Sequence, residues 1–151
     1  TLKTLSESWK KGNIQETMVP ISQMKDLGVV CDFFNHAFMQ NNVNKDYLKV
    51  EQCIYFLPNV VNLINSKYET SFRVGIKMVC MMFDCYSDSI ESAFKNKNFS
   101  SEKTKENYTK MVNFFEEITK NERVLGRDLE KDKNLSALLD EMRDFCKKCK
   151  K

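Results

Sequence analysis

The sequence contains few of the residues that break regular secondary structure, with four glycines and two prolines among 151 residues. β-Sandwiches and β-barrels need frequent tight turns, and those turns use glycine and proline heavily. Neither architecture is therefore expected. The phosphate-binding patterns GxxxxGK[ST] and GxGxxG, which need glycine at fixed positions, are also absent.

Histidine occurs once, at His36, within an amphipathic helical pattern where a structural or surface role is the default. Nucleophilic catalysis needs a nucleophile and a base within reach of each other, and no such pair is evident. The carboxylates are interspersed with lysines, so no acid–base pair can be selected either. We therefore predict that the chain is not an enzyme and has no catalytic, cofactor-binding or metal-binding residues.

Long hydrophobic runs are missing as well. No stretch approaches the roughly 18 uncharged apolar residues of a membrane span, and no cationic leader precedes an apolar core. A membrane-spanning segment or a retained signal peptide is therefore not expected. Hydrophobic residues make up 42% of the chain, too many for a disordered segment, and the length suits one domain over residues 1–151.

Six cysteines are present, and four of them fall inside apolar helical runs, where free cysteine behaves as a small hydrophobic residue (Cys31, Cys53, Cys80, Cys85). We expect these to be reduced, as in the cytosol or nucleus. Cys146 and Cys149 form half of a zinc knuckle, with no second close pair nearby. Residues 146–151 are interpreted as a flexible, solvated basic tail, with a metal or redox site as the alternative.

Apolar residues recur at spacings of three and four along nearly the whole chain, which predicts an all-α fold. The expected architecture is an irregular antiparallel helical-repeat bundle, a HEAT-like α-solenoid of about five to seven helices. The predicted helices cover residues 2–11, 13 onward with an interruption at Pro20, 26–42, 44–64 with a kink at Pro58, 66–94, 102–127 and 135–145.

Local signals refine these boundaries. Asp26 is a predicted N-cap, and Ser66 with Glu69 has the spacing of a capping box. Gly75 would allow another backbone to approach the longest helix closely.

Two pairs of adjacent phenylalanines, Phe33–Phe34 and Phe114–Phe115, cannot both point to one side of a helix, since neighbouring residues diverge by about 100°. Either a second helix or a partner protein covers the remaining ring. Trp9, the sole tryptophan, is similarly either an interface anchor or a contact between the first helix and the core.

The net charge of +3 is unevenly distributed. Residues 1–94 carry nine basic and ten acidic residues, whereas residues 95–151 carry fifteen basic and eleven acidic ones. This excess is consistent with solvated lysine-rich helix faces or with contact to an acidic polymer.

Four stretches occur in order and with characteristic spacing: Trp9 with Gly12, Asp26-Leu27-Gly28-Val29-Val30, Leu57-Pro58 and Ser66-Lys67-Tyr68-Glu69. Together they resemble the conserved C-terminal domain of katanin's regulatory B subunit. The resemblance is clearest over residues 9–90 and fades over 95–151, where a stretch around Tyr108 matches. Pro20, the methionine-rich centre and the Cys-Lys-Lys-Cys sequence depart from the family pattern and favour a katanin B-like paralogue.

The resemblance implies a helical-repeat adaptor that binds the N-terminal helical domain of katanin's catalytic AAA ATPase and modulates or targets microtubule severing. Implied locations are the cytoplasm, the cytoskeleton with its spindle poles, and the nucleus; implied partners include tubulin and spindle-pole proteins, but not membranes. The residues selected for ATPase contact are Trp9, Phe33, Lys67 and Tyr68, and those for microtubule contact are Lys103, Lys105, Lys110, Arg123 and Arg127. The alternative is a helical scaffold whose basic C-terminal third binds nucleic acid or another protein.

Overall fold

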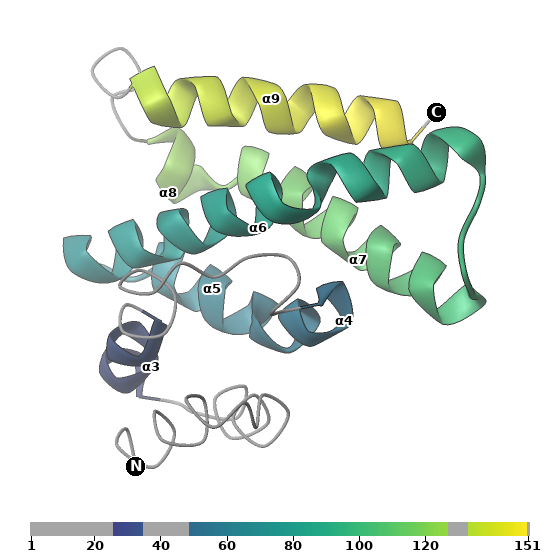
Figure 1. Cartoon of the computed structure of the whole chain (residues 1–151). Coiled ribbons are helices and arrows are strands. Elements are labelled where there is room, and N and C mark those ends of the chain that lie inside the picture. The colour runs from purple at the N-terminus through teal and green to yellow at the C-terminus, as the bar shows by residue number, and fades with distance from the viewer. Residues whose placement is uncertain (1–25, 35–48, 127–132, 151) are drawn as a thin grey trace. The chain divides into compact units, whose positions relative to one another are not determined.

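The computed structural model describes residues 26–34, 49–126 and 133–150 (Figure 1). All regular elements in these ranges are helical, which confirms the all-α prediction; the solenoid arrangement stays a prediction. The elements are α3 (Leu27–Phe34), α4 (Val50–Cys53), the 3-10 helix η2 (Ile54–Phe56), α5 (Leu57–Ile64), α6 (Glu69–Asn96), α7 (Glu102–Thr119), α8 (Glu122–Leu125) and α9 (Lys133–Cys149). The helices predicted before residue 26, including the interruption at Pro20, lie outside the described residues.

The chain forms two compact units, residues 1–79 and 80–151, and α6 contributes residues to both. Each unit is described by itself below. Within the described ranges, no helix is both long enough and apolar enough to cross a membrane.

The first unit begins its described part with α3, and the predicted cap is present. Asp26 Oδ1 accepts hydrogen bonds from the Gly28 N–H at 3.0 Å and the Val29 N–H at 3.4 Å, which confirms the N-cap. α3 packs against α5. The fully buried rings of Phe34 and Phe56 meet edge to face, with centroids 5.4 Å apart, so aromatic packing joins α3 to η2.

The predicted helix over residues 44–64 is divided where the structure describes it. The backbone passes from α4 through η2 into α5, and Pro58 lies in the first turn of α5. Proline is tolerated there because the first N–H groups of a helix have no intrahelical acceptor. The backbone stays helical through Pro58, as expected, but residues 54–56, just before α5, have 3-10 geometry.

The predicted capping box at Ser66 is wrong in its register. The Ser66 hydroxyl accepts the Tyr68 N–H at 3.2 Å, and α6 begins at Glu69, two residues later than a cap at Ser66 would place it. Ser66 therefore forms a local turn that precedes the helix. Glu69 pairs instead along the helix with Arg73, at 3.2 Å.

The prediction that Gly75 allows another backbone to approach the longest helix closely is confirmed. A β-carbon at this position would lie 2.8 Å from Ile64 Cγ1 and 3.2 Å from Leu63 Cβ. The end of α5 and the first half of α6 can pack this closely only because residue 75 has no side chain.

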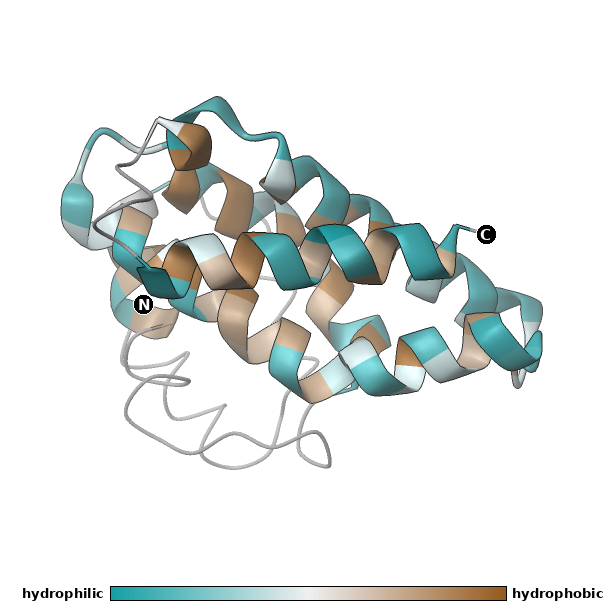
Figure 2. Ribbon diagram, turned by 90° about the horizontal axis from the view of Figure 1, so that it is seen from above, coloured by the Kyte–Doolittle hydropathy of each residue, from teal (hydrophilic) through white to brown (hydrophobic). Residues whose placement is uncertain are grey.

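The second unit is organised around three aromatic rings from three helices. Phe83 of α6 contacts Phe115 of α7 and Phe145 of α9, each with centroids 5.4 Å apart, and Phe115 lies 5.8 Å from Phe145. All three contacts are edge to face, the arrangement that aromatic quadrupoles favour. Hydrophobic and hydrophilic residues alternate in bands along α9, the helix that ends near the label C in Figure 2. Its apolar side completes this core.

The predicted helix over residues 102–127 is wrong in extent. α7 ends at Thr119, and α8 restarts at Glu122. The Asn121 side chain causes the restart by accepting the Arg123 N–H at 2.9 Å and the Val124 N–H at 3.1 Å. The apolar pattern continues through Val124, which is why spacing alone does not reveal the break.

The predicted tail at residues 146–151 is also wrong for the part that the structure describes. α9 continues to Cys149, and the Cys146 and Cys149 side chains are each only 6% exposed. They fall on the apolar side of the helix, in phase with Leu138, Met142 and Phe145. The last turns of α9 therefore belong to the folded unit.

Candidate protein-interaction surfaces

Lys67 and Tyr68 form an exposed pair immediately before α6. The Tyr68 ring is 63% exposed, and Lys67 Nζ lies 5.3 Å from its centroid. The backbone beneath the ring is fixed, since the Tyr68 N–H donates to Ser66 Oγ and the Tyr68 carbonyl accepts the Phe72 N–H at 3.1 Å. An exposed aromatic on a fixed backbone, next to a cation, is typical of an interface anchor.

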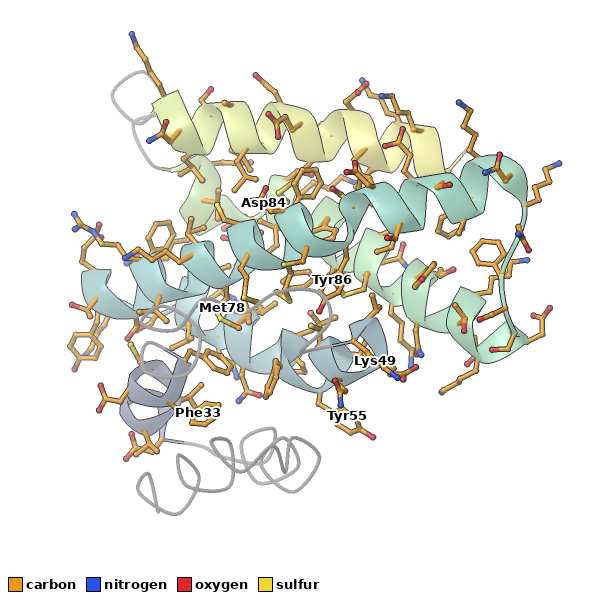
Figure 3. The ribbon with its side chains drawn as sticks, in the orientation of Figure 1. Phe33, Lys49, Tyr55, Met78, Asp84 and Tyr86 are labelled. Carbon is orange, nitrogen blue, oxygen red and sulfur yellow. The ribbon has the colours of Figure 1, made fainter. Side chains whose placement is uncertain are left out.

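Tyr55 is another exposed aromatic of the first unit. It lies on η2 (Figure 3), between half-buried Ile54 and fully buried Phe56. Tyr55 is 43% exposed. Helical spacing does not identify Tyr55, because this residue lies outside the apolar stripe. An aromatic residue beside such a stripe was the sequence signal for an exposed ring.

Phe33 does not lie on the surface. It belongs to α3 (Figure 3). Its side chain is fully buried and packs on Phe34 with ring centroids 6.0 Å apart. Phe114 and Phe115 are also buried, with exposures of 5% and 0%. Core packing therefore accounts for both phenylalanine pairs, and the folded chain does not present the Phe33 ring for partner contact.

Trp9 and Arg127 lie outside the described residues. The other predicted microtubule contacts do not form one patch. Lys103 and Lys110 are exposed on the same side of α7, whereas Lys105 lies about 200° around the helix, with Nζ 5.9 Å from the Phe99 centroid. Arg123 belongs to α8 and is half-buried.

A different set of basic residues does converge in the second unit. A cleft of about 570 Å³ between the C-terminal parts of α7 and α9 is lined by four basic side chains, Lys120, Arg143, Lys147 and Lys150, together with Glu116, Thr119 and Cys146. We call this feature the cationic cleft. Arg143, Lys147 and Lys150 share one helix face because they are spaced by four and seven residues. That spacing was the sequence signal for the cleft.

Among the described residues that line the cationic cleft, Glu116 is the single acidic one. Its carboxylate accepts hydrogen bonds from Lys150 and from Lys120, the latter at 3.0 Å. These contacts, Lys150 first, lower the pKa of Glu116. With four basic side chains and one carboxylate, the described residues of the lining have a net charge of +3.

An acidic groove of about 340 Å³ lies between α6 and α9 in the same unit. Five carboxylates line it, with Asp84 labelled in Figure 3: Asp84, Asp88, Glu91, Glu141 and Asp144. Lys148 bridges Asp144 at 3.1 Å and Glu91 at 3.6 Å, and these carboxylates, Asp144 first, raise the pKa of Lys148. α9 thus has a basic and an acidic side.

In the described part of the chain, no cysteine takes part in a disulfide bond. Burial raises the pKa of Cys146 to about 11 and that of Cys149 to about 12, and Cys146 Sγ donates to the Val112 carbonyl at 3.7 Å. No cluster of three or more metal-ligating side chains occurs in residues 26–34, 49–126 and 133–150. Of the four cysteines assigned to apolar helical runs, Cys31 and Cys53 are buried, and Cys80 and Cys85 are half-buried.

Comparison with known proteins gives one family. The family model of the con80 domain of katanin matches residues 1–145. KATNB1-like protein 1 of Mus musculus is 31% identical over 68 residues, which cover 45% of this chain and 23% of the mouse protein. The match therefore spans about a quarter of that relative's length. No solved structure matches.

Proposed function

The chain belongs to the family of the con80 domain of katanin, and we propose that it is a non-catalytic regulatory domain that binds the N-terminal helical domain of katanin's catalytic ATPase. In this proposal the chain modulates or targets microtubule severing, and the ATPase supplies the chemistry. The observation that carries it is the extent of the family match, which includes residues 1–145. The similarity to the mouse protein supports a place among the katanin B-like paralogues.

The Lys67–Tyr68 pair is our proposed ATPase contact. An exposed tyrosine whose backbone is already fixed loses little conformational freedom when a partner covers it, so more of the burial energy remains for binding. Lys67 adds a charge that can pair with a carboxylate at the rim of the interface. Trp9 is a further proposed contact, on sequence grounds alone.

The test is binding of the purified chain to the N-terminal helical region of the ATPase. We expect Tyr68→Ala to weaken the complex at least about tenfold, because removal of an interface anchor costs about 2 kcal/mol or more. Tyr55→Ala is the matched control, since it removes an exposed aromatic of the same unit, and should leave affinity unchanged. Calorimetry or fluorescence anisotropy measures both.

Two outcomes of this test distinguish the proposed ATPase-binding function from the proposed contact site. Absence of any complex at micromolar concentrations would reject the ATPase-binding function. A complex that tolerates Tyr68→Ala would retain the function and reject the Lys67–Tyr68 contact.

Direct microtubule binding is a second part of the proposal. Lys103 and Lys110, which share a face of α7, are its best-placed candidates, with Lys105, Arg123 and Arg127 proposed beside them. Contact between exposed lysines and an acidic tubulin surface should weaken with salt. Cosedimentation with microtubules should therefore decrease at higher ionic strength and in Lys103→Glu/Lys110→Glu. Salt-independent binding would contradict this contact. Association with the cytoskeleton and spindle poles belongs to the same proposal.

A further inference from the structure

The cationic cleft has the size and lining of a ligand site. Its volume of about 570 Å³ falls within the range of roughly 300–1,000 Å³ that small-ligand pockets occupy. Lysine and arginine contribute long aliphatic stems as well as charge, and the buried Cys146 adds an apolar wall. The cleft therefore combines an apolar lining with charged groups at the ends of flexible side chains.

Glu116 indicates which chemistry the basic side chains accept. Its carboxylate, within the lining, already takes hydrogen bonds from Lys120 and Lys150. Charge-assisted contacts between ammonium and carboxylate groups are thus formed here without a ligand. Arg143 and Lys147 face the same cleft. Carboxylates of a ligand would pair with Lys147, compete with Asp140 for Arg143, whose Nη1 lies 3.3 Å from Asp140 Oδ1, and compete with Glu116 for the other two lysines.

We propose that the cationic cleft binds a short acidic peptide segment that places one apolar side chain in the cleft and its flanking carboxylates on the surrounding basic residues. Charge complementarity with a lining of net charge +3 selects the acidic segment. The apolar walls select the central side chain. This site is formed by other residues than the Lys67–Tyr68 contact and adds a second ligand class to the proposed function.

A peptide suits the cleft better than a polyphosphate chain. Glu116 places a negative charge among the basic residues, which disfavours a ligand of dense continuous charge. A peptide can position its carboxylates away from Glu116 and fill the space between them with an apolar group.

The binding test uses the full chain and three fluorescein-labelled peptides. The first is Glu-Glu-Glu-Phe-Glu-Glu-Glu, the second replaces Phe by Ser, and the third replaces every Glu by Gln. We expect the first peptide to bind at least about fivefold more tightly than either of the others, since each loses one of the two complementary features. Polyphosphate of matched charge is the fourth ligand and should bind more weakly than the first peptide.

Variants assign the binding to the cleft. Arg143→Glu and Lys147→Glu should each weaken binding of the first peptide at least about fivefold, because a repulsive charge replaces an attractive one. Lys77→Glu and Lys95→Glu make the same charge change at exposed α6 positions outside the lining, and should alter affinity less than about twofold. Circular dichroism checks that all variants fold.

Glu116→Gln provides a variant that should gain affinity. It removes the competing carboxylate and releases Lys120 and Lys150 for the ligand, so we expect binding about twofold to fivefold tighter. Unchanged or weaker binding would overturn the competition that defines this site.

Three other results would overturn the proposal. They are equal binding of the Phe and Ser peptides, equal effects of the cleft and control charge reversals, and preference for polyphosphate. All of these measurements are made without the ATPase. Rejection of the cleft proposal therefore leaves the proposed katanin function intact, and absence of ATPase binding leaves the cleft proposal intact.

Discussion

Gly75 of α6 lies against Ile64 at the end of α5, so closely that a β-carbon on Gly75 would be 2.8 Å from Ile64 Cγ1 and 3.2 Å from Ile64 N. The second contact is with backbone, which cannot rotate away as a side chain can. The separation between these two helices in the first unit is therefore set by the absence of one methyl group.

We predict that Gly75→Ala destabilises the chain despite the better helix propensity of alanine. Overpacking costs about 1–3 kcal/mol, and replacing a helical glycine by alanine returns about 1 kcal/mol, which leaves a net loss of up to about 2 kcal/mol. Urea unfolding measures the change. Lys77→Ala, an exposed site on the same helix, should stay within about 0.5 kcal/mol. A Gly75→Ala protein at least as stable as the parent would contradict the close packing.

Phe115 should be among the most sensitive positions of the second unit. It is fully buried and contacts both Phe83 and Phe145. Phe115→Ala should lower the free energy of unfolding by about 3–5 kcal/mol, because it leaves a cavity between three helices. Phe115→Leu keeps most of the volume and should cost less. Equal losses for the two variants, by thermal or urea unfolding, would argue against a cavity effect.

Ser101 caps α7, with its hydroxyl accepting the Thr104 N–H at 3.1 Å. Ser101→Ala should cost about 0.5–2 kcal/mol, the usual loss for an N-cap. Ser101→Asp retains an acceptor and adds a charge that the helix N-terminus favours, so it should restore stability. Failure of the aspartate variant to exceed the alanine variant in unfolding experiments would refute the capping role.

Because two thiols are buried, we predict that the free energy of unfolding falls at alkaline pH. Since burial raises the pKa of Cys146 to about 11 and that of Cys149 to about 12 from an ordinary value of 9.0, the folded state favours their protonated forms. Their stabilisation is fully present below about pH 9 and is lost as the pH rises towards 11 and 12. Urea unfolding between about pH 8 and pH 10 should show a smaller loss in Cys146→Ala/Cys149→Ala than in the parent.

The control for this pH effect is Met142→Ala, which removes a fully buried side chain of α9 that has no titratable group and should retain the parental pH dependence. Identical slopes for all three proteins would show that the buried thiols do not titrate differently on unfolding.

The fold was predictable where a local signal and the apolar pattern agree. Asp26 precedes an apolar stripe and caps α3, and the stripe from Phe72 to Phe94 became α6. The predictions fail where one side chain competes with a continuing pattern. Asn121 interrupts an apolar stripe that itself gives no sign of a break, and Ser66 bonds two residues ahead instead of three.

The candidate surfaces were less predictable because they depend on tertiary packing. The exposure of Lys67 and Tyr68 was compatible with their predicted role, whereas Phe33 is buried among residues of the first unit. Of the basic residues chosen by their position in the C-terminal third, those that the structure describes are spread over α7 and α8. The cationic cleft joins Lys120 with Arg143 across 23 positions of sequence, and only the packing of α7 against α9 reveals it.

The two buried thiols of α9 can also report when the end of this helix detaches from the folded unit. Cys146 and Cys149 can meet an alkylating reagent only when the end of α9 detaches, so their labelling rate records how often that detachment occurs. A ligand that holds α9 in place would slow this reaction without altering the half-buried Cys80 and Cys85. Mass spectrometry of the alkylated cysteines can thus measure whether a ligand is bound to α9, with no dye or tag attached.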